Sequence, residues 1–263
     1  MVPYSHAVQL HPRDVSVYSV VFSEDWYQGR GVYGGLQFAM MARALEEAAG
    51  PDREIRSFSA ECCTPPRAGE GVVRVLPLRT GRTVSQLAAE ILQDGESVSF
   101  ATATLGGPRD SSHDFDESTP PYAGEGLELA NGTLPPPFTQ HFQYYFCYGE
   151  PPMSGAMLAE TGCRVRLHHP PARWSAPLVL AYVDAIWPAI LPLMTHMPVM
   201  GTVSFHAHLR GDYSDVEAGP EAPALLIARS QHTRQGYSSQ ENVLWSADGK
   251  LLCRSLQLVA IIR

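Results

Sequence analysis

The chain has 263 residues, of which 44% are hydrophobic and 17% charged, a composition typical of one large globular domain or two smaller ones. Its net charge of −8 argues against nucleic acid as the main partner, because duplex binding requires a basic face. The most apolar stretch, residues 177–194, contains an aspartate and three prolines, so we expect no membrane span.

The five cysteines form no CxxC pair and no disulfide framework. The first residues have neither a basic region nor an apolar core, so we expect no secretory signal. Cysteines that remain reduced, in a chain for which no secretory signal is expected, predict a cytoplasmic protein. We predict neither a metal nor a cofactor.

The N-terminal half begins with a predicted strand over 14–22, where β-branched residues alternate with polar ones. A helix is predicted over 32–50, since Gly50 and Pro51 form a typical helix stop. Four strands joined by short turns follow, and Asp94-Gly95 is expected to close the last hairpin.

Residues 107–138 are rich in proline, glycine and acidic residues and are predicted to be a surface connector. The pattern then restarts, with strands predicted over 138–148 and 162–169. A helix is expected over 171–191, with Ser175 as N-cap and Pro177 in its first turn. Four further strands are predicted, over 201–210, 223–231, 238–246 and 250–262, and Asp248-Gly249 is expected to close the last hairpin.

Each half therefore consists of one apolar helix followed by an antiparallel meander that ends in an Asp-Gly hairpin. This order predicts an α+β fold of two similar modules joined edge to edge, which would remove two exposed sheet edges. The alternative is a chain without a repeat that carries two common Asp-Gly turns by coincidence.

Several segments resemble the type II acyl-CoA thioesterases. "VYGGLQFAMMARAL" and "LRTGRTVSQLAAEILQDGESVSFATATL" are similar to the first half of that family, and "LAYVDAIWPA", "GTVSFHAHLRGD" and "GKLLCRSLQLVAIIR" to its second half. The resemblance implies a double hotdog fold, two tandem repeats that each wrap a curved antiparallel sheet around one long helix. We place the N-terminal hotdog at 1–107, the connector at 108–138 and the C-terminal hotdog, with the catalytic residues, at 139–263.

The resemblance also implies hydrolysis of a fatty acyl-CoA to the free acid and CoA, and further pairing into a homo-oligomer. The family's catalytic aspartate, threonine and glutamine fall on Asp184, Thr202 and Gln257. Many members carry a histidine in the strand after the first helix, where this chain has Ser59, so no role for a histidine there is implied.

The residues themselves support a function for Asp184. A carboxylate in so apolar a segment costs several kcal/mol to bury unless it is paired or protonated, and no basic residue lies between Arg173 and His196. Pro188 lacks the N–H that would bind the carbonyl of Asp184, so the helix is expected to kink or loosen there. Such surroundings raise the pKa of a carboxyl group towards that of a general base. The alternative is a structural aspartate at a wet helix face or capping a nearby backbone group.

Thr202 and Gln257 both donate and accept hydrogen bonds, which suits them to holding a water between base and carbonyl. Strand alternation, however, places Thr202 on the face opposite Phe205, away from the helix. A bulge, or a site at the joint between the halves, is needed to bring Thr202 to the aspartate.

For the oxyanion we expect backbone N–H groups near Gly34 and Gly35, at the start of the first helix. The phosphates of CoA require local arginines, with Arg82 and Arg234 as the main candidates. Arg79, Arg164, Arg166 and Arg229 are further candidates near predicted strand ends.

Other readings find less support. "GRGVYG" at 29–34 matches a dinucleotide-binding pattern, but it lacks the strand directly before it. His206 and His208 form a possible metal pair without a third ligand at a typical spacing. The chain contains no G-x-S-x-G nucleophile motif. A hotdog that binds an acyl thioester as a carrier or sensor remains the main alternative, and a hotdog hydratase a third.

Overall fold

The computed structural model describes residues 1–113, 115–130 and 135–262. Its helices are α1 (Tyr4–Ala7), α2 (Gly34–Ala49) and α3 (Ala176–Val183), with 3-10 turns η1 (Glu24–Trp26), η2 (Pro137–His141) and η3 (Leu191–Leu193). The strands are β1 (His11–Asp14), β2 (Val17–Phe22), β3 (Tyr27–Gln28), β4 (Gly31–Val32), β5 (Glu54–Cys62), β6 (Gly69–Thr80), β7 (Val84–Gln93), β8 (Glu96–Gly106), β9 (Leu127–Leu129), β10 (Phe142–Gly149), β11 (Glu160–Leu167), β12 (Val199–Leu209), β13 (Ala224–Arg234), β14 (Tyr237–Trp245) and β15 (Leu251–Ile262).

One large antiparallel sheet contains all of these strands except the short β3–β4 pair. Its order is β1-β2-β6-β7-β8-β5-β12-β15-β14-β13-β11-β10-β9. Read from either side toward the centre, the order is the same: β2-β6-β7-β8-β5 in the N-terminal half and β11-β13-β14-β15-β12 in the C-terminal half. The two halves thus repeat one topology, as their matched order of elements predicts.

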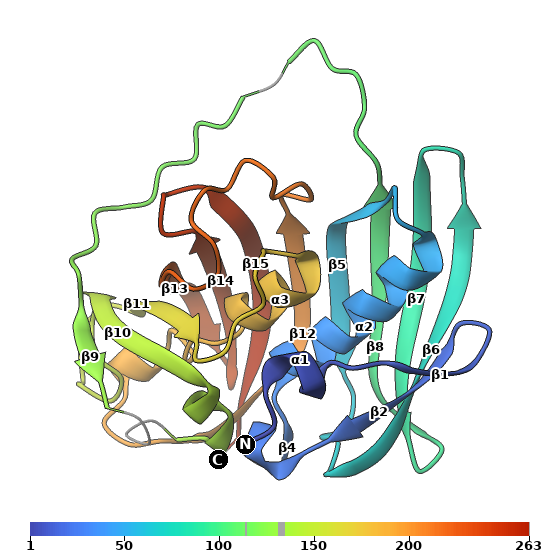
Figure 1. Ribbon diagram of the computed structural model, residues 1–263. Coiled ribbons are helices and arrows are strands. Elements are labelled where there is room, and N and C mark those ends of the chain that lie inside the picture. Colours follow the sequence, from blue (N-terminus) through green and yellow to red (C-terminus); the bar gives the residue numbers. More distant parts are fainter. Residues whose placement is uncertain (114, 131–134, 263) are drawn as a thin grey trace.

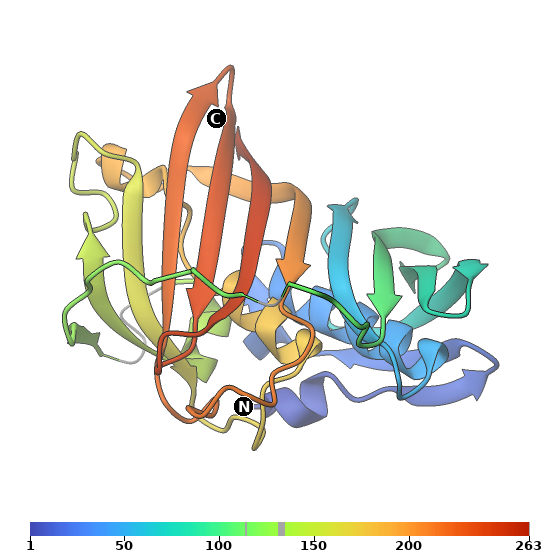
Figure 2. The same cartoon turned by 90° about the horizontal axis from the view of Figure 1, so that it is seen from above.

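The two main helices lie side by side on one face of the sheet, in contact with each other (Figure 1). Viewed from above, the sheet curves around them (Figure 2). Their apolar side chains form the core; most residues of α2 and all residues of α3 are buried. The core is therefore shared between the halves.

The halves meet edge to edge through β5 and β12, which pair antiparallel with Phe205 opposite Ala60. Three phenylalanines fill the core beneath this joint. Phe38 of α2 stacks on Phe205 of β12 with ring centroids 4.6 Å apart, and Phe58 of β5 lies 5.9 Å from Phe38. The junction expected from the sequence is thus both hydrogen-bonded and packed.

The first helix ends as predicted, since Gly50 adopts a positive φ of 88° at its C-cap. The second helix is much shorter than the predicted span of 171–191 and ends at Val183. Asp184 occupies its C-cap, and the chain continues without a regular helix until η3. Ser175 lies at the N-cap but makes no side-chain capping hydrogen bond, and Pro177 lies in the first turn.

The two Asp-Gly turns differ. Asp94 and Gly95 both have positive φ, 55° and 84°, as a two-residue hairpin turn requires. The turn at Asp248 is longer, because the β14–β15 loop runs from Ser246 to Lys250 and is closed by hydrogen bonds to Ser246.

The described part of the connector is mostly irregular and runs past the ends of the central strands (Figures 1 and 2). It adds the short edge strand β9 to β10. Its Ala123 packs against a small apolar cluster that includes Leu225 and Trp245, on the outer face of the sheet. No helix within the described residues is long and apolar enough to cross a membrane.

Candidate functional site

Asp184 lies at the point where the C-terminal end of α3 meets the N-terminal end of α2. Its side chain is 6% exposed, and its φ of −92° and ψ of −2° lie in the sparsely populated bridge region between the helical and extended basins. The C-terminal end of a helix disfavours a negative charge and the N-terminal end favours one. The carboxylate thus turns from its own helix toward α2.

Two groups hold the carboxylate in place. Gln257 Nε2 of β15 donates to Asp184 Oδ1 at 2.5 Å, and the backbone N–H of Gly35 donates a second hydrogen bond. Burial raises the pKa of Asp184 to about 7, although both hydrogen bonds act to lower it. The group therefore changes its charge near neutral pH, as a general base requires.

The other carboxylate oxygen faces the start of α2. A Cβ added to Gly34 would lie 2.9 Å from Asp184 Oδ2 and 3.4 Å from the Phe38 ring. Gly34 itself is half-buried, whereas Gly35 is buried. Because only a glycine leaves room here, Oδ2 lies against the backbone at the start of α2.

The bulge needed to bring Thr202 to the inner face is present. The β12–β15 register shifts between Thr202 and Ser204, which leaves Val203 as the extra residue. Thr202 then pairs with Val259, which shares the buried face of Gln257. Thr202 and Gln257 therefore lie on the same face, although no hydrogen bond among the described residues joins Thr202 to Asp184.

The two expected oxyanion donors, the N–H groups of Gly34 and Gly35, differ in whether they are already hydrogen-bonded. The Gly35 N–H is already bound to Asp184, whereas Gly34 is half-buried at the first turn of α2. The first N–H groups of a helix have no intrahelical partner, so the Gly34 N–H remains the better candidate.

The arginine candidates separate in space. Arg82 lies beside the C-terminal end of α2, where Arg53 binds the carbonyls of Gly81 and Arg82. That end is one helix length from Gly34, about 24 Å for 16 residues. The structure therefore does not bring Arg82 to the aspartate.

Arg234 lies on the same side of the molecule as the aspartate. It pairs with Tyr237, which pairs with Ala260, which in turn pairs with Gly201 next to Thr202. Of the other candidates, Arg79 is exposed, whereas Arg164, Arg166 and Arg229 bind Gly124, Gln143 and Glu160, respectively.

Ser59, for which no histidine role was implied, lies on the outer face of β5 and contacts His206 Nδ1 at 2.6 Å. His206 Nε2 is in turn 3.1 Å from His208 Nε2. The described part of the chain contains no group of three or more His, Cys, Asp or Glu side chains that could hold a metal ion.

Several residues around Asp184 carry no signal in the sequence. Cys62 lies at the end of β5, near Asp184. Burial, and then the negative charge of Asp184, raise the pKa of the Cys62 thiol to about 12. The thiol therefore stays protonated and is no nucleophile at neutral pH.

Tyr33, Tyr144 and Asn242 bind the backbone near Asp184 and are far from it in sequence. Only their spatial contacts identify them.

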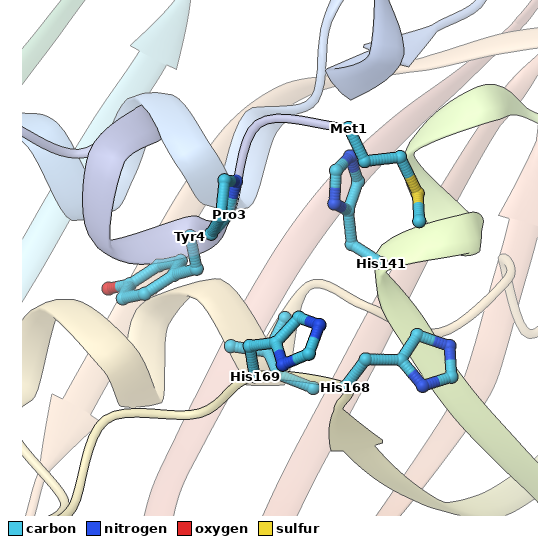
Figure 3. Close-up of a pocket in the computed structure, with 7 residues that line it drawn as sticks. Met1, Pro3, Tyr4, His141, His168 and His169 are labelled. Carbon is cyan, nitrogen blue, oxygen red and sulfur yellow. The ribbon is translucent and has the colours of Figure 1, made fainter.

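A separate cavity of about 300 Å³ lies where the N-terminal segment meets the end of β11 (Figure 3). His141, in η2, and His168 and His169, directly after β11, contribute to its lining together with Met1, Pro3, Tyr4 and Leu167. The cavity includes neither Asp184 nor any other predicted site residue.

Two sequence families match the chain. The acyl-CoA thioesterase N-terminal domain family matches residues 22–106, and the acyl-CoA thioesterase C-terminal domain family matches residues 112–261. Among curated proteins, no sequence matches.

Solved structures resemble the chain over nearly its full length. A protein of unknown function with a hot dog fold from Alicyclobacillus acidocaldarius has a TM-score of 0.87 at 23% identity, covering 99% of this chain and 98% of that one. The tesB protein of Mycobacterium avium subsp. paratuberculosis has a TM-score of 0.81 at 14% identity, covering 99% and 98%. The acyl-CoA thioesterase II TesB2 of Mycobacterium marinum has a TM-score of 0.75 at 13% identity, covering 98% and 96%. Likeness at such identities shows the hotdog fold.

Proposed function

Because the chain belongs to the acyl-CoA thioesterase family, we propose that it hydrolyses a fatty acyl-CoA thioester to the free acid and CoA. The observation that carries the proposal is the Asp184 carboxyl group, buried at the α2–α3 junction with a pKa of about 7. A carboxyl group with this pKa can accept a proton at neutral pH and release it again.

In the proposed mechanism Asp184 is the general base. Gln257 holds Oδ1, so Oδ2 is the oxygen that accepts a proton from water. As the proton moves to Oδ2, the water oxygen bonds to the thioester carbonyl carbon. Thr202, on the same sheet face as Gln257, is proposed to orient this water.

The negative charge then moves to the carbonyl oxygen. The backbone N–H of Gly34, at the positive end of the α2 dipole, is proposed to stabilise it. When the carbon–sulfur bond breaks, the electron pair leaves with sulfur, and the proton held by Asp184 passes to the CoA thiolate. The products are the carboxylic acid and free CoA.

The exposed Arg234 is proposed to bind a CoA phosphate, since it lies on the cross-strand row next to Thr202. Arg82 is a weaker candidate, because it lies at the far end of α2.

The five cysteines form no disulfide in the described structure, which supports the proposal that the protein acts in the cytoplasm.

The test measures release of free thiol from acyl-CoAs of increasing chain length by the wild type and by Asp184→Asn. We expect the wild type to release thiol and Asp184→Asn to lower kcat at least ~100-fold, since general bases contribute this much or more. Asp212→Asn, which changes an exposed carboxylate in the loop after β12, should keep wild-type rates.

A thermal melt shows whether the variant is folded. The folded-state pKa of Asp184 is about 7 against an ordinary 3.8, so wild-type stability falls as pH rises from about 4 to about 7. Asp184→Asn does not undergo this loss of stability and should melt at or above the wild-type temperature at pH 8.

Wild-type rates of thiol release by Asp184→Asn would refute the assignment of Asp184 as the base. Tight acyl-CoA binding by the wild type without thiol release would instead indicate a carrier or sensor.

A further inference from the structure

The backbone carbonyl groups around Asp184 require hydrogen-bond donors from outside their own helix. The last carbonyls of a helix have no intrahelical partner, and leaving such a group unpaired in the core is costly. Helix α3 ends at Val183 inside the core, where every one of its residues is buried. The chain beyond Asp184 does not continue as a helix, and the N–H group of Ala185 binds the carbonyl of Tyr182 rather than that of Ala181.

Side chains from three other elements supply the donors. The Tyr33 hydroxyl donates to the carbonyl of Ala181 at 2.6 Å. Asn242 Nδ2 donates to the carbonyl of Val183 at 3.1 Å. The Tyr144 hydroxyl donates to the carbonyl of Ala185 at 2.9 Å.

These three donors are buried, and they hold the backbone on both sides of Asp184. Tyr33 precedes α2, Tyr144 belongs to β10 and Asn242 to β14, so their anchors lie in separate parts of the fold. Tyr33 and Asn242 are fully buried and Tyr144 is 3% exposed. Water therefore cannot easily replace a missing donor.

Two of the donors, Tyr33 and Asn242, are themselves fixed by neighbours. The Tyr33 ring stacks on Phe138 with centroids 4.0 Å apart, and its hydroxyl occupies the space that a side chain at Gly35 would need. Asn242 Oδ1 accepts from Gln240 Nε2 at 2.6 Å, and Gln240 Oε1 accepts from the N–H of Ala189 at 2.7 Å. These two donors thus have little freedom to follow a displaced backbone.

We propose that Tyr33, Tyr144 and Asn242 are positioning residues that hold Asp184 against the start of α2. The inference rests on the proposed function, in which Asp184 is the general base. A displacement of about 1 Å can cost a catalytic group ~100-fold in rate. Tyr33 lies in the N-terminal half, so this half orients the base that the C-terminal half carries.

The experiment compares three variants that each delete one buried hydroxyl: Tyr33→Phe, Tyr144→Phe and the control Tyr182→Phe. Tyr182 lies on α3 and is fully buried; its hydroxyl binds the backbone of Leu167 and Pro220, not the segment around Asp184. Tyr33→Phe and Tyr144→Phe each lose one buried hydrogen bond, and the control Tyr182→Phe loses two. We expect a lower melting temperature in all three variants, with a drop in the control at least as large as in the other two.

Only the two variants near Asp184 should change the reaction. Tyr33→Phe and Tyr144→Phe should lower kcat by about tenfold or more while KM stays within about twofold, because the base is misplaced and substrate contacts are kept. Tyr182→Phe should keep the wild-type kcat. Equal kcat in all four proteins, or an equal loss in all three variants, would overturn the positioning role.

A second measurement does not depend on turnover. The carboxyl carbon of Asp184 can be followed by NMR titration, with Asp184→Asn identifying its signal. Burial raises the pKa of Asp184, so a loosened backbone that admits water should lower it toward the ordinary value in Tyr33→Phe and Tyr144→Phe. An unchanged pKa in both variants would count against positioning. Absence of wild-type turnover would refute the proposed function and leave this test valid.

Discussion

Asp184 is subject to opposing influences that set the pH at which its carboxyl group ionises. Burial disfavours the charge, whereas the hydrogen bonds from Gln257 and Gly35 favour it. Within the described parts of the chain, no charged side chain contributes appreciably to the shift. The balance leaves the pKa of Asp184 near 7, so Gln257 keeps the group ionisable at neutral pH as well as orienting it.

The pH dependence of turnover should follow this balance. A general base works when deprotonated, so kcat should rise with pH and level off above an apparent pKa near 7. Gln257→Leu keeps most of the side-chain volume but removes the donor that lowers the pKa of Asp184. Its kcat profile should therefore shift to higher pH. A pH series of initial rates measures both midpoints, and a midpoint that stays in place or falls would contradict the assigned role of Gln257.

At the residue scale the sequence made Asp184 a candidate, because an unpaired acid in an apolar segment needs an explanation. The family resemblance added Gln257, and the structure joins the two side chains by a hydrogen bond. Tyr33 and Asn242 were missed because their partners lie 148 and 59 residues away. A buried tyrosine or asparagine in a sequence does not show which carbonyl it binds.

At the scale of the elements, α2 and α3 show how local and distant interactions compete. Gly50 ends α2 where the sequence predicts, because a glycine that adopts a positive φ is a local helix stop. The apolar run after Val183 suggests a longer α3, yet the chain leaves the helix at Asp184. The carbonyls and N–H groups it frees bind side chains of β10 and β14, which a local pattern cannot reveal.

The start of α2 provides a prediction at this scale. Gly34→Ala places a Cβ 2.9 Å from Asp184 Oδ2, so the carboxylate or the helix start must move. We expect kcat to fall ~100-fold, in line with a displacement of about 1 Å at a catalytic group. Gly201→Ala is a matched control, since it lies beside Thr202 and its added Cβ would meet no atom within 4 Å.

The two alanine variants are compared by initial rates and by thermal melts. Gly201→Ala should keep a kcat within about twofold of the wild type, because nothing is displaced. Wild-type turnover by Gly34→Ala would show that the close approach of the helix start to Asp184 has no importance for the reaction.

At the scale of the whole molecule, the repeated order of strands places the same strand of each half at the centre of one sheet. The sequence predicts this repeat because the order of helix and meander is visible in local patterns. It does not predict that β5 and β12 pair with Phe205 opposite Ala60, since register across the joint depends on core packing. The shared core beneath the joint makes the two halves one structural unit.

Because the two halves share one core, we expect the chain to unfold as a single cooperative unit. Phe205 of β12 packs against Phe38 and Phe58 of the other half and is 2% exposed. Phe205→Ala should therefore cost about 3–5 kcal/mol of unfolding free energy, the usual loss for a buried phenylalanine. Phe22 of β2 is equally buried, but it belongs to the sheet of the N-terminal half alone.

Differential scanning calorimetry of the wild type, Phe205→Ala and Phe22→Ala separates the alternatives. If the halves unfold together, each protein shows one transition whose calorimetric and van't Hoff enthalpies agree. Both substitutions then move that whole transition to lower temperature. If the halves were independent, two transitions would appear, and Phe22→Ala would move only one of them. Since Tyr33 of the N-terminal half binds the backbone beside Asp184, we expect a single transition and loss of thiol release over the same temperature range.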